Sequence, residues 1–258
     1  MNTPEPNPTV DFGQSKSSHI SARHRFHSTH WSVVSRAGDG QDSQHRQALE
    51  SLFQAYWYPL YAFARRSGQD PHQAEDLTQA FFAKMLEKDF VSSADPQRGK
   101  FRTFLLVVFK RFMINDHEHE QTQRQGGRVD HLSLDIESSE QRYAMEPSDD
   151  WTPERLFDRQ WAITLLNSVM SKLEAEHQRP EQRKLFRKLR GFLGGGRETP
   201  YAEIAQELEI PASSLRVTVH RLRQRYREIL RLEIAQTLDD PSEIDEELGY
   251  LRSAIRAQ

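Results

Sequence analysis

The sequence contains no cysteine. This absence excludes disulfide bonds, thiolate zinc sites and cysteine nucleophiles. The sequence also lacks an apolar run near the roughly 20 residues that a membrane-spanning helix needs, and its first residues lack the apolar core of a signal peptide. These absences predict a protein of the cytoplasm that has no membrane partner.

A strong excess of positive charge is missing too, because the formal net charge is only -3. The charges are nevertheless unevenly distributed. Residues 183–231 carry 12 Lys and Arg against 5 Glu, whereas residues 232–258 carry 2 Arg against 7 Asp and Glu. A basic segment followed by an acidic one predicts a DNA-binding module beside an element that competes with DNA or docks elsewhere. A C-terminal helix with a solvated acidic face is the alternative.

Strand patterns are absent as well, and the helical spacing of apolar residues predicts an all-α fold. Helices are expected at residues 47–66, 71–88, 100–115, 153–173 and 184–192. Pro59 is expected to disturb the middle of the first, Gly68 to follow its end, and Thr152 to cap the start of the fourth.

The chain divides into five expected parts. Residues 1–27 are rich in Pro, Ser, Asn and His and are predicted to form a disordered tail. Residues 28–125 form a first helical domain, residues 126–152 a polar linker without a helical period, and residues 153–231 a second helical domain. Residues 232–258 form an acidic extension, whose spaced apolar residues fit a helix that folds back on the DNA-reading part.

Residues 200–230 carry two helical stripes separated by the very short connector Glu209-Ile210-Pro211. This spacing predicts a helix-turn-helix, in which the second helix enters a major groove. The side chains on its outer face combine short hydroxyls with long cations: Ser213, Ser214, Arg216, Val217, His220, Arg221 and Arg223. A solvated basic face on an ordinary helical hairpin is the alternative.

Two residues of this connector depart from the usual pattern. Glu209 occupies the turn position where glycine is common, and a positive φ there costs about 1 kcal/mol or more. Pro211 replaces the usual serine, so the second helix loses a side-chain cap. Both departures predict less exact reading of the DNA sequence by this element.

Several segments, in order, resemble the bacterial RNA polymerase sigma factors of the extracytoplasmic-function (ECF) group of the sigma-70 family, in a long variety typical of planctomycete-like bacteria. The segments are THWSVVSRAGDG, YWYPLYAFARRSG, QAEDLTQAFFAKMLE, GKFRTFLLVVFKRFMIN, WTPERLFDRQWA and YAEIAQELEIPASSLRVTVHRLRQRYR. The resemblance covers residues 28–250. It implies a sigma region 2-like bundle and a C-terminal region 4-like domain that reads the minus-thirty-five element.

The resemblance also implies two surfaces on the region 2-like domain. Glu75, Asp76 and Gln79 are expected to be exposed and to dock on core RNA polymerase, although the two acids also suit a helix N-terminus. Gln73 stands where the family usually has an acid. The minus-ten element is expected to contact Arg98, Lys100, Arg102, Lys110, Arg111 and Asn115, with Phe101 or Phe104 stacking on a base.

The expected function is therefore that of a promoter-recognition subunit that has no catalysis of its own. Its expected partners are core RNA polymerase and promoter DNA, and three modes of control stay open: an anti-sigma factor, a kinase and the acidic extension. The histidines at 24, 27, 30, 117 and 119 lack the spacing of a metal site, so no metal or other cofactor is expected. Two alternatives stay open: a helix-turn-helix regulator that does not engage polymerase, and a protein that sequesters a sigma partner.

Overall fold

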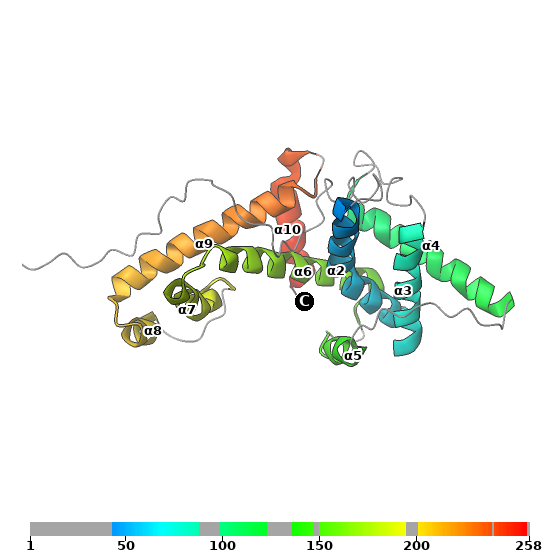
Figure 1. Cartoon of the computed structure of the whole chain (residues 1–258), viewed down its shortest axis with the longest axis horizontal. Coiled ribbons are helices and arrows are strands. Elements are labelled where there is room, and N and C mark those ends of the chain that lie inside the picture. Colours follow the sequence, from blue (N-terminus) through cyan, green and yellow to red (C-terminus); the bar gives the residue numbers. More distant parts are fainter. Residues whose placement is uncertain are drawn as a thin grey trace, which may run out of the picture.

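The computed structural model describes residues 43–87, 99–122, 136–146, 150–194, 201–238 and 240–256. The elements within these ranges are helices and no strand occurs among them, which confirms the all-α prediction. None of these helices is apolar over a length that would cross a bilayer. The expected tail at 1–27 and the THWSVVSRAGDG segment lie outside the described residues. The elements, shown in Figure 1, are α2 (Ser43–Arg66), α3 (Pro71–Glu87), α4 (Phe101–Thr122), α5 (Ile136–Ala144), α6 (Pro153–Ala175), α7 (Pro180–Leu189), the 3-10 helix η3 (Arg190–Phe192), α8 (Tyr201–Glu207), α9 (Ala212–Ala235), the 3-10 helix η4 (Pro241–Glu243) and α10 (Ile244–Ile255).

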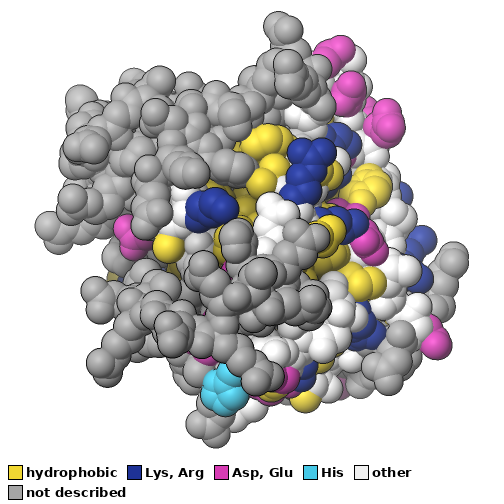
Figure 2. Space-filling view, turned by 90° about the vertical axis from the view of Figure 1, so that its right-hand side faces the viewer, with side chains coloured by type: hydrophobic (Ala, Val, Ile, Leu, Met, Phe, Trp, Pro, Cys, Tyr) yellow, Lys and Arg dark blue, Asp and Glu magenta, His cyan; other side chains and the backbone are white. Residues whose placement is uncertain are grey.

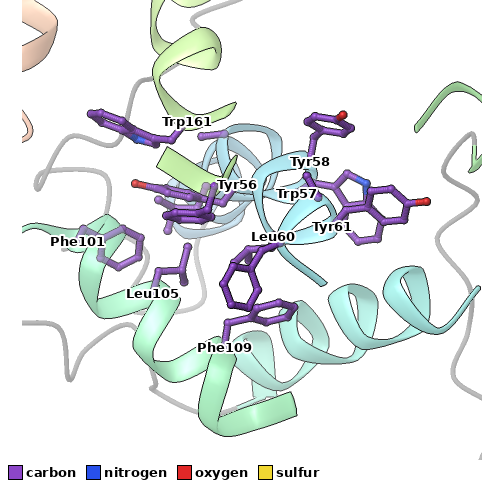
Figure 3. Close-up of a cluster of buried hydrophobic side chains, with 14 of the residues drawn as sticks. Tyr56, Trp57, Tyr58, Leu60, Tyr61, Phe101, Leu105, Phe109 and Trp161 are labelled. Atoms are coloured by element: carbon purple, nitrogen blue, oxygen red, sulfur yellow. The ribbon is translucent and has the colours of Figure 1, made fainter. Parts of the chain in front are cut away.

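The larger hydrophobic cluster is built around α2. Figure 3 shows Tyr56 and Leu60 of α2 facing Phe101 and Phe109 of α4, and all four side chains are almost completely buried. Aromatic rings meet edge to face in this cluster, at 5.7 Å between the centroids of Tyr56 and Phe101. The first half of α6 closes the cluster through Phe157. Burial of so many large rings makes this part of the chain the main source of hydrophobic stabilisation.

A second hydrophobic cluster joins α7, η3, α8 and α9 to the second half of α6. The long helix α6 therefore contributes to both clusters, with Phe157 in the first and Leu173 in the second. Leu230 of α9 packs against both. The two clusters are thus connected by α6 and α9, and the division into two domains stays a prediction.

Two helices end with the same backbone arrangement around a residue of positive φ. After α2, Gly68 has φ 98°, and the N–H of Gln69 donates to the carbonyl of Ala64 at 3.2 Å. After α8, Glu209 has φ 54°, and the N–H of Ile210 donates to the carbonyl of Ala205 at 3.0 Å. Both are Schellman endings, in which glycine is the favoured residue. The expected positive φ of Glu209 is confirmed.

Replacing Glu209 by glycine is expected to raise the free energy of unfolding by about 0.5–1 kcal/mol. Glycine removes the left-handed strain, and its greater freedom in the unfolded chain offsets part of that gain. Urea titration followed by circular dichroism measures the change. Gln206→Gly, one turn earlier in α8, is the control and should lose about 1 kcal/mol. Equal losses in both variants would contradict the strain at Glu209.

The starts of two helices also follow from their sequences. The hydroxyl of Thr152 accepts from the N–H of Arg155 at 3.2 Å, which confirms the predicted cap of α6. At α3, the carboxylate of Asp70 accepts from the N–H of Gln73 at 2.9 Å, and the side chain of Gln73 accepts from the N–H of Asp70 at 3.1 Å. This reciprocal pair is a capping box, so Gln73 has a structural role at the helix start.

Helix α2 runs unbroken through Pro59.

The prediction that residues 126–152 lack helical structure is wrong for α5. This helix of 9 residues is held against α2 by the guanidinium of Arg65, which donates to both carboxylate oxygens of Glu140 at 2.7 and 3.0 Å. Tyr61 donates to the same carboxylate at 2.6 Å, and the guanidinium carbon of Arg142 lies 3.5 Å from the ring centroid of Tyr58. The hydrogen bond from Arg65 lowers the pKa of Glu140. Tertiary contacts, rather than an apolar stripe, therefore stabilise α5.

The acidic extension forms a helix, as its apolar spacing predicts. Helix α9 first continues to Ala235, past the expected boundary at 231, and η4 and α10 follow. Leu251 and Ala254 of α10 are buried in the larger cluster, beside α6 and the end of α9. In Figure 1, α10 stands where α9 and α6 approach the α2 bundle. The extension therefore packs at the centre of the molecule.

Candidate nucleic-acid interface

Helix α9 exposes all the side chains that the sequence assigns to its outer face. Ser213 and Ser214 begin this face, and Arg216, Val217, His220, Arg221 and Arg223 follow along it. Val217 is 51% exposed, which is high for an apolar side chain. The opposite face is buried through Leu215, Val219 and Leu222 against α8 and its neighbours. The helix is thus fixed from behind, with its hydroxyls and cations in solvent.

The start of α9 has no side-chain cap, as Pro211 predicts. Its first backbone N–H groups are therefore not satisfied by a side chain at the N-cap, and such groups bind phosphate well. Further along, Arg223 donates from Nε to the carbonyl of Phe192 at 3.0 Å. Arg223 is therefore partly used for packing against η3, whereas Arg216 and Arg221 project from the first turns of the helix.

A second set of predicted residues lies on α4. Arg111 and Asn115 are exposed, one turn apart. Val107 and Ile114, on the same helix, are 43% and 60% exposed. The end of the molecule that carries α3 and α4 shows hydrophobic and basic side chains side by side (Figure 2). Apolar and cationic groups together suit a single strand of nucleic acid, whose bases stack and whose phosphates pair with cations.

Lys110 lies on the same helix but is partly engaged. Its ammonium group pairs with Glu154 at the start of α6, and this bond lowers the pKa of Glu154. Both side chains remain more than a third exposed, so the pair is worth little in water. Arg98, the first of the predicted cations, lies outside the described residues.

Lys100 and Arg102 are not presented to solvent as the prediction requires. Both donate to the carboxylate of Glu247 on α10, one cation to each oxygen. Arg102 is 5% exposed and Glu247 is 0% exposed. In this conformation an acid of the C-terminal extension already pairs with these two cations, and their contact with phosphate stays a prediction.

Arg102 is enclosed on several sides. Its guanidinium carbon lies 4.2 Å from the ring centroid of Trp161 on α6 and 4.9 Å from that of Tyr250 on α10. Asp158 lies 3.8 Å from Arg102 and accepts a hydrogen bond from the hydroxyl of Tyr250. Burial raises the pKa of Asp158 more than its hydrogen bond with Tyr250 and the charge of Arg102 lower it. Residues from α4, α6 and α10 thus form one polar cluster.

The sequence analysis does not predict this cluster, although one pattern in the sequence indicates it. Glu247 precedes Leu251 by four residues and Ala254 by seven, so it lies on the buried stripe of α10. An acid on an apolar stripe predicts a buried cation nearby, since unpaired buried charges are costly. The identity of that cation, about 145 positions earlier in the chain, could not be read from the pattern.

Phe101 and Phe104, the two aromatic residues expected to stack on a base, differ in their exposure. Phe101 is 3% exposed and packs edge to face with Tyr56, so its ring is part of the core. Phe104 is partly buried at the edge of the same cluster, 6.0 Å from Phe101 between ring centroids. Phe101 is thus not a platform for a base, whereas Phe104 retains some exposed surface.

The predicted polymerase-docking residues differ in their exposure. Asp76 is exposed, but Glu75 and Gln79 are only 7% and 9% exposed, which corrects the expectation that all three face solvent. The amide of Gln79 donates to the carboxylate of Glu75 at 2.9 Å, as side chains four apart on a helix can. Only Asp76 of the three presents its charge on the surface of α3.

Part of the chain matches a known family model. Residues 52–122 match the family model described as sigma-70 region 2, a segment that spans most of α2 and all of α3 and α4. No curated protein and no solved structure matches the chain. The matched segment contains Asp76, Arg111 and Asn115, the exposed members of the two predicted surfaces. The match covers 71 of the 258 residues, and it supports a sigma-70 family RNA polymerase sigma factor, a protein of transcription initiation.

Proposed function

We propose that this protein is an ECF-group sigma factor that directs core RNA polymerase to promoters and has no catalysis of its own. In this role α4 contacts the minus-ten element as a separated strand, and the helix-turn-helix formed by α8 and α9 reads the minus-thirty-five element as a duplex. The polymerase supplies the metal and the chemistry. Core RNA polymerase and promoter DNA are the partners.

The observation that carries this proposal is the outer face of α9 in a chain that also contains a region 2 match. All seven side chains assigned to that face, including Arg216 and Arg221, are exposed, while its back is buried. Arginine pairs with guanine edges and with phosphates, and short hydroxyls at the helix start can approach base edges or phosphates. A chain that reads duplex DNA but never binds polymerase would not need region 2, so the match disfavours that alternative.

Reconstitution tests the proposal directly. The purified protein is combined with core RNA polymerase on fragmented genomic DNA, and transcript starts are mapped. Starts that share a pair of upstream sequence elements, and that core polymerase alone does not produce, are the expected result. An unchanged set of starts would exclude the sigma role.

The duplex-reading surface has its own test. Arg216→Ala and Arg221→Ala are each expected to weaken binding to a minus-thirty-five duplex by about 1–3 kcal/mol, because each removes a base-edge or phosphate contact. Fluorescence anisotropy at moderate salt measures the affinity. Arg227→Ala is the matched control, since Arg227 is an exposed arginine about three turns beyond Arg216 on the same helix. An equal loss in the control would show only a general effect of charge.

A further inference from the structure

We propose that α10 is an autoinhibitory latch, in which Glu247 occupies Lys100 and Arg102 of α4 and must be displaced before these cations bind a DNA strand. The inference rests on the proposed function, because it assigns those two cations to the DNA contact of α4. The occupant is a segment of the same chain, and the ligand that displaces it is the phosphate backbone of a single strand.

Glu247 pairs with both cations at once and leaves Arg102 inaccessible to another anion. Glu247 is fully buried and gives one carboxylate oxygen to Arg102 and the other to Lys100. The guanidinium of Arg102 is also covered by the rings of Trp161 and Tyr250. A phosphate cannot reach Arg102 while α10 is in place, since Tyr250 and Glu247 both belong to that helix.

The carboxylate of Glu247 and a phosphate of DNA are equivalent ligands for these cations. A carboxylate and a phosphate diester each offer anionic oxygens to the same cations, and arginine binds both through paired hydrogen bonds. Exchange of one anion for the other therefore leaves Lys100 and Arg102 paired and avoids a buried, uncompensated charge. Glu247 thus acts at this position as an internal substitute for nucleic acid.

Helix α10 can leave without dismantling the core. The helix has 12 residues, and only Leu251 and Ala254 of it belong to the buried part of the larger cluster. Ile244, Leu248 and Ile255 pack against the edge of the same cluster. The polar attachments include the bond from Tyr250 to Asp158 and the exposed pair of Arg231 with Asp245. The rings of α2 and α4 pack on one another without it (Figure 3).

The charge of the extension supports the same assignment. Residues 232–258 carry 7 acids against 2 arginines. Removing this helix from α4 would take negative charge away from the DNA-binding side and expose two cations there. Both changes favour a polyanion, and the gain should depend on salt because phosphate binding releases counterions.

The test compares Glu247→Gln with Glu246→Gln in the full-length protein. Glu246 is the neighbouring residue and is exposed, so it controls for the lost charge alone. Binding to a fluorescein-labelled single-stranded oligonucleotide is measured by anisotropy at several salt concentrations. Glu247→Gln should bind about tenfold more tightly than wild type, with a salt slope steeper by about 1.4 because two further cations contact the strand. Glu246→Gln should stay within about twofold of wild type.

Hydrogen exchange provides a second measurement that requires no variant. In the wild-type protein, amides of α10 should exchange faster when the oligonucleotide is bound than when it is absent. Unchanged exchange at saturating oligonucleotide would overturn the latch. Faster exchange of α10 in Glu247→Gln without tighter DNA binding would overturn it too, by showing that Lys100 and Arg102 make no DNA contact. Mapped transcript starts and duplex binding by α9 would still test the sigma role independently.

Discussion

Replacing Phe157 by alanine is expected to lower the free energy of unfolding by about 3–5 kcal/mol. Phe157 lies on α6, is 0% exposed, and stacks on Tyr56 of α2 with ring centroids 6.4 Å apart. Truncation removes the buried ring and leaves a cavity that the surrounding helices fill only in part. This site joins α6 to the α2 bundle, so the loss should loosen both.

Chemical denaturation followed by tryptophan fluorescence measures this loss. Ile114→Ala on α4 is the control, because Ile114 is 60% exposed and its truncation should change stability by about 0.5 kcal/mol or less. A loss below about 1 kcal/mol for Phe157→Ala would mean that α6 does not pack on α2 as described.

Arg102→Met is expected to be nearly as damaging, with a loss of about 3–5 kcal/mol near neutral pH. Methionine keeps much of the volume between Trp161 and Tyr250 but leaves the buried carboxylate of Glu247 with Lys100 as its remaining partner in an ion pair. Unpaired buried charge, rather than lost packing, causes the loss. The double variant Arg102→Met, Glu247→Leu should therefore recover most of it, since replacing a whole buried ion pair by apolar groups is often neutral.

The pH dependence of the single variant provides a signature that packing alone would not give. In the wild-type protein burial acts to raise the pKa of Glu247, but the bonds and charges of Arg102 and Lys100 outweigh burial and lower that pKa. A lowered folded-state pKa stabilises the protein above the unfolded pKa, and this stability is lost as pH falls through the folded value. Without Arg102 the effect of burial gains weight, so the loss of stability caused by the substitution should shrink as pH falls from about 7 to about 4.

A double-mutant cycle of unfolding free energies at two pH values measures both effects. Burial raises the pKa of Tyr250, so its hydroxyl stays protonated at both pH values. Asp158 lies 3.8 Å from Arg102, and the effect of Arg102→Met in the Glu247→Leu background measures the contribution of Asp158 separately. A loss for Arg102→Met that is independent of pH, and that the double variant does not recover, would contradict the pairing with Glu247.

Helix positions could be predicted because their cause is local. Apolar residues at helical spacing, the hydroxyl of Thr152 and the turn position of Glu209 all act within a few residues of the chain. The helices α2, α3, α4, α6 and α9 follow these signals closely, and so do the cap of α6 and the positive φ of Glu209.

Helix α5 and the cluster around Glu247 could not be predicted in the same way, because their cause is tertiary. An isolated helix of 9 residues is marginal in water, and α5 depends on contacts such as Glu140 with Arg65, 75 positions apart. The exposure of the predicted site residues also depends on tertiary contacts. The family resemblance implied that Lys100 and Arg102 bind phosphate, but their exposure is decided by what packs against them, and a distant acid does so here.

The length of α9 has a mechanical consequence. The helix has 24 residues, which corresponds to about 36 Å, and runs unbroken from the basic face at its start to the packing on α6 at its end. A rigid rod of this length multiplies small rotations. Tilting α9 by about 10° around its C-terminal end would carry Arg216 through about 5 Å, more than the rise of one base pair. A change of packing beside α10 would thus shift the position at which the basic face meets the DNA.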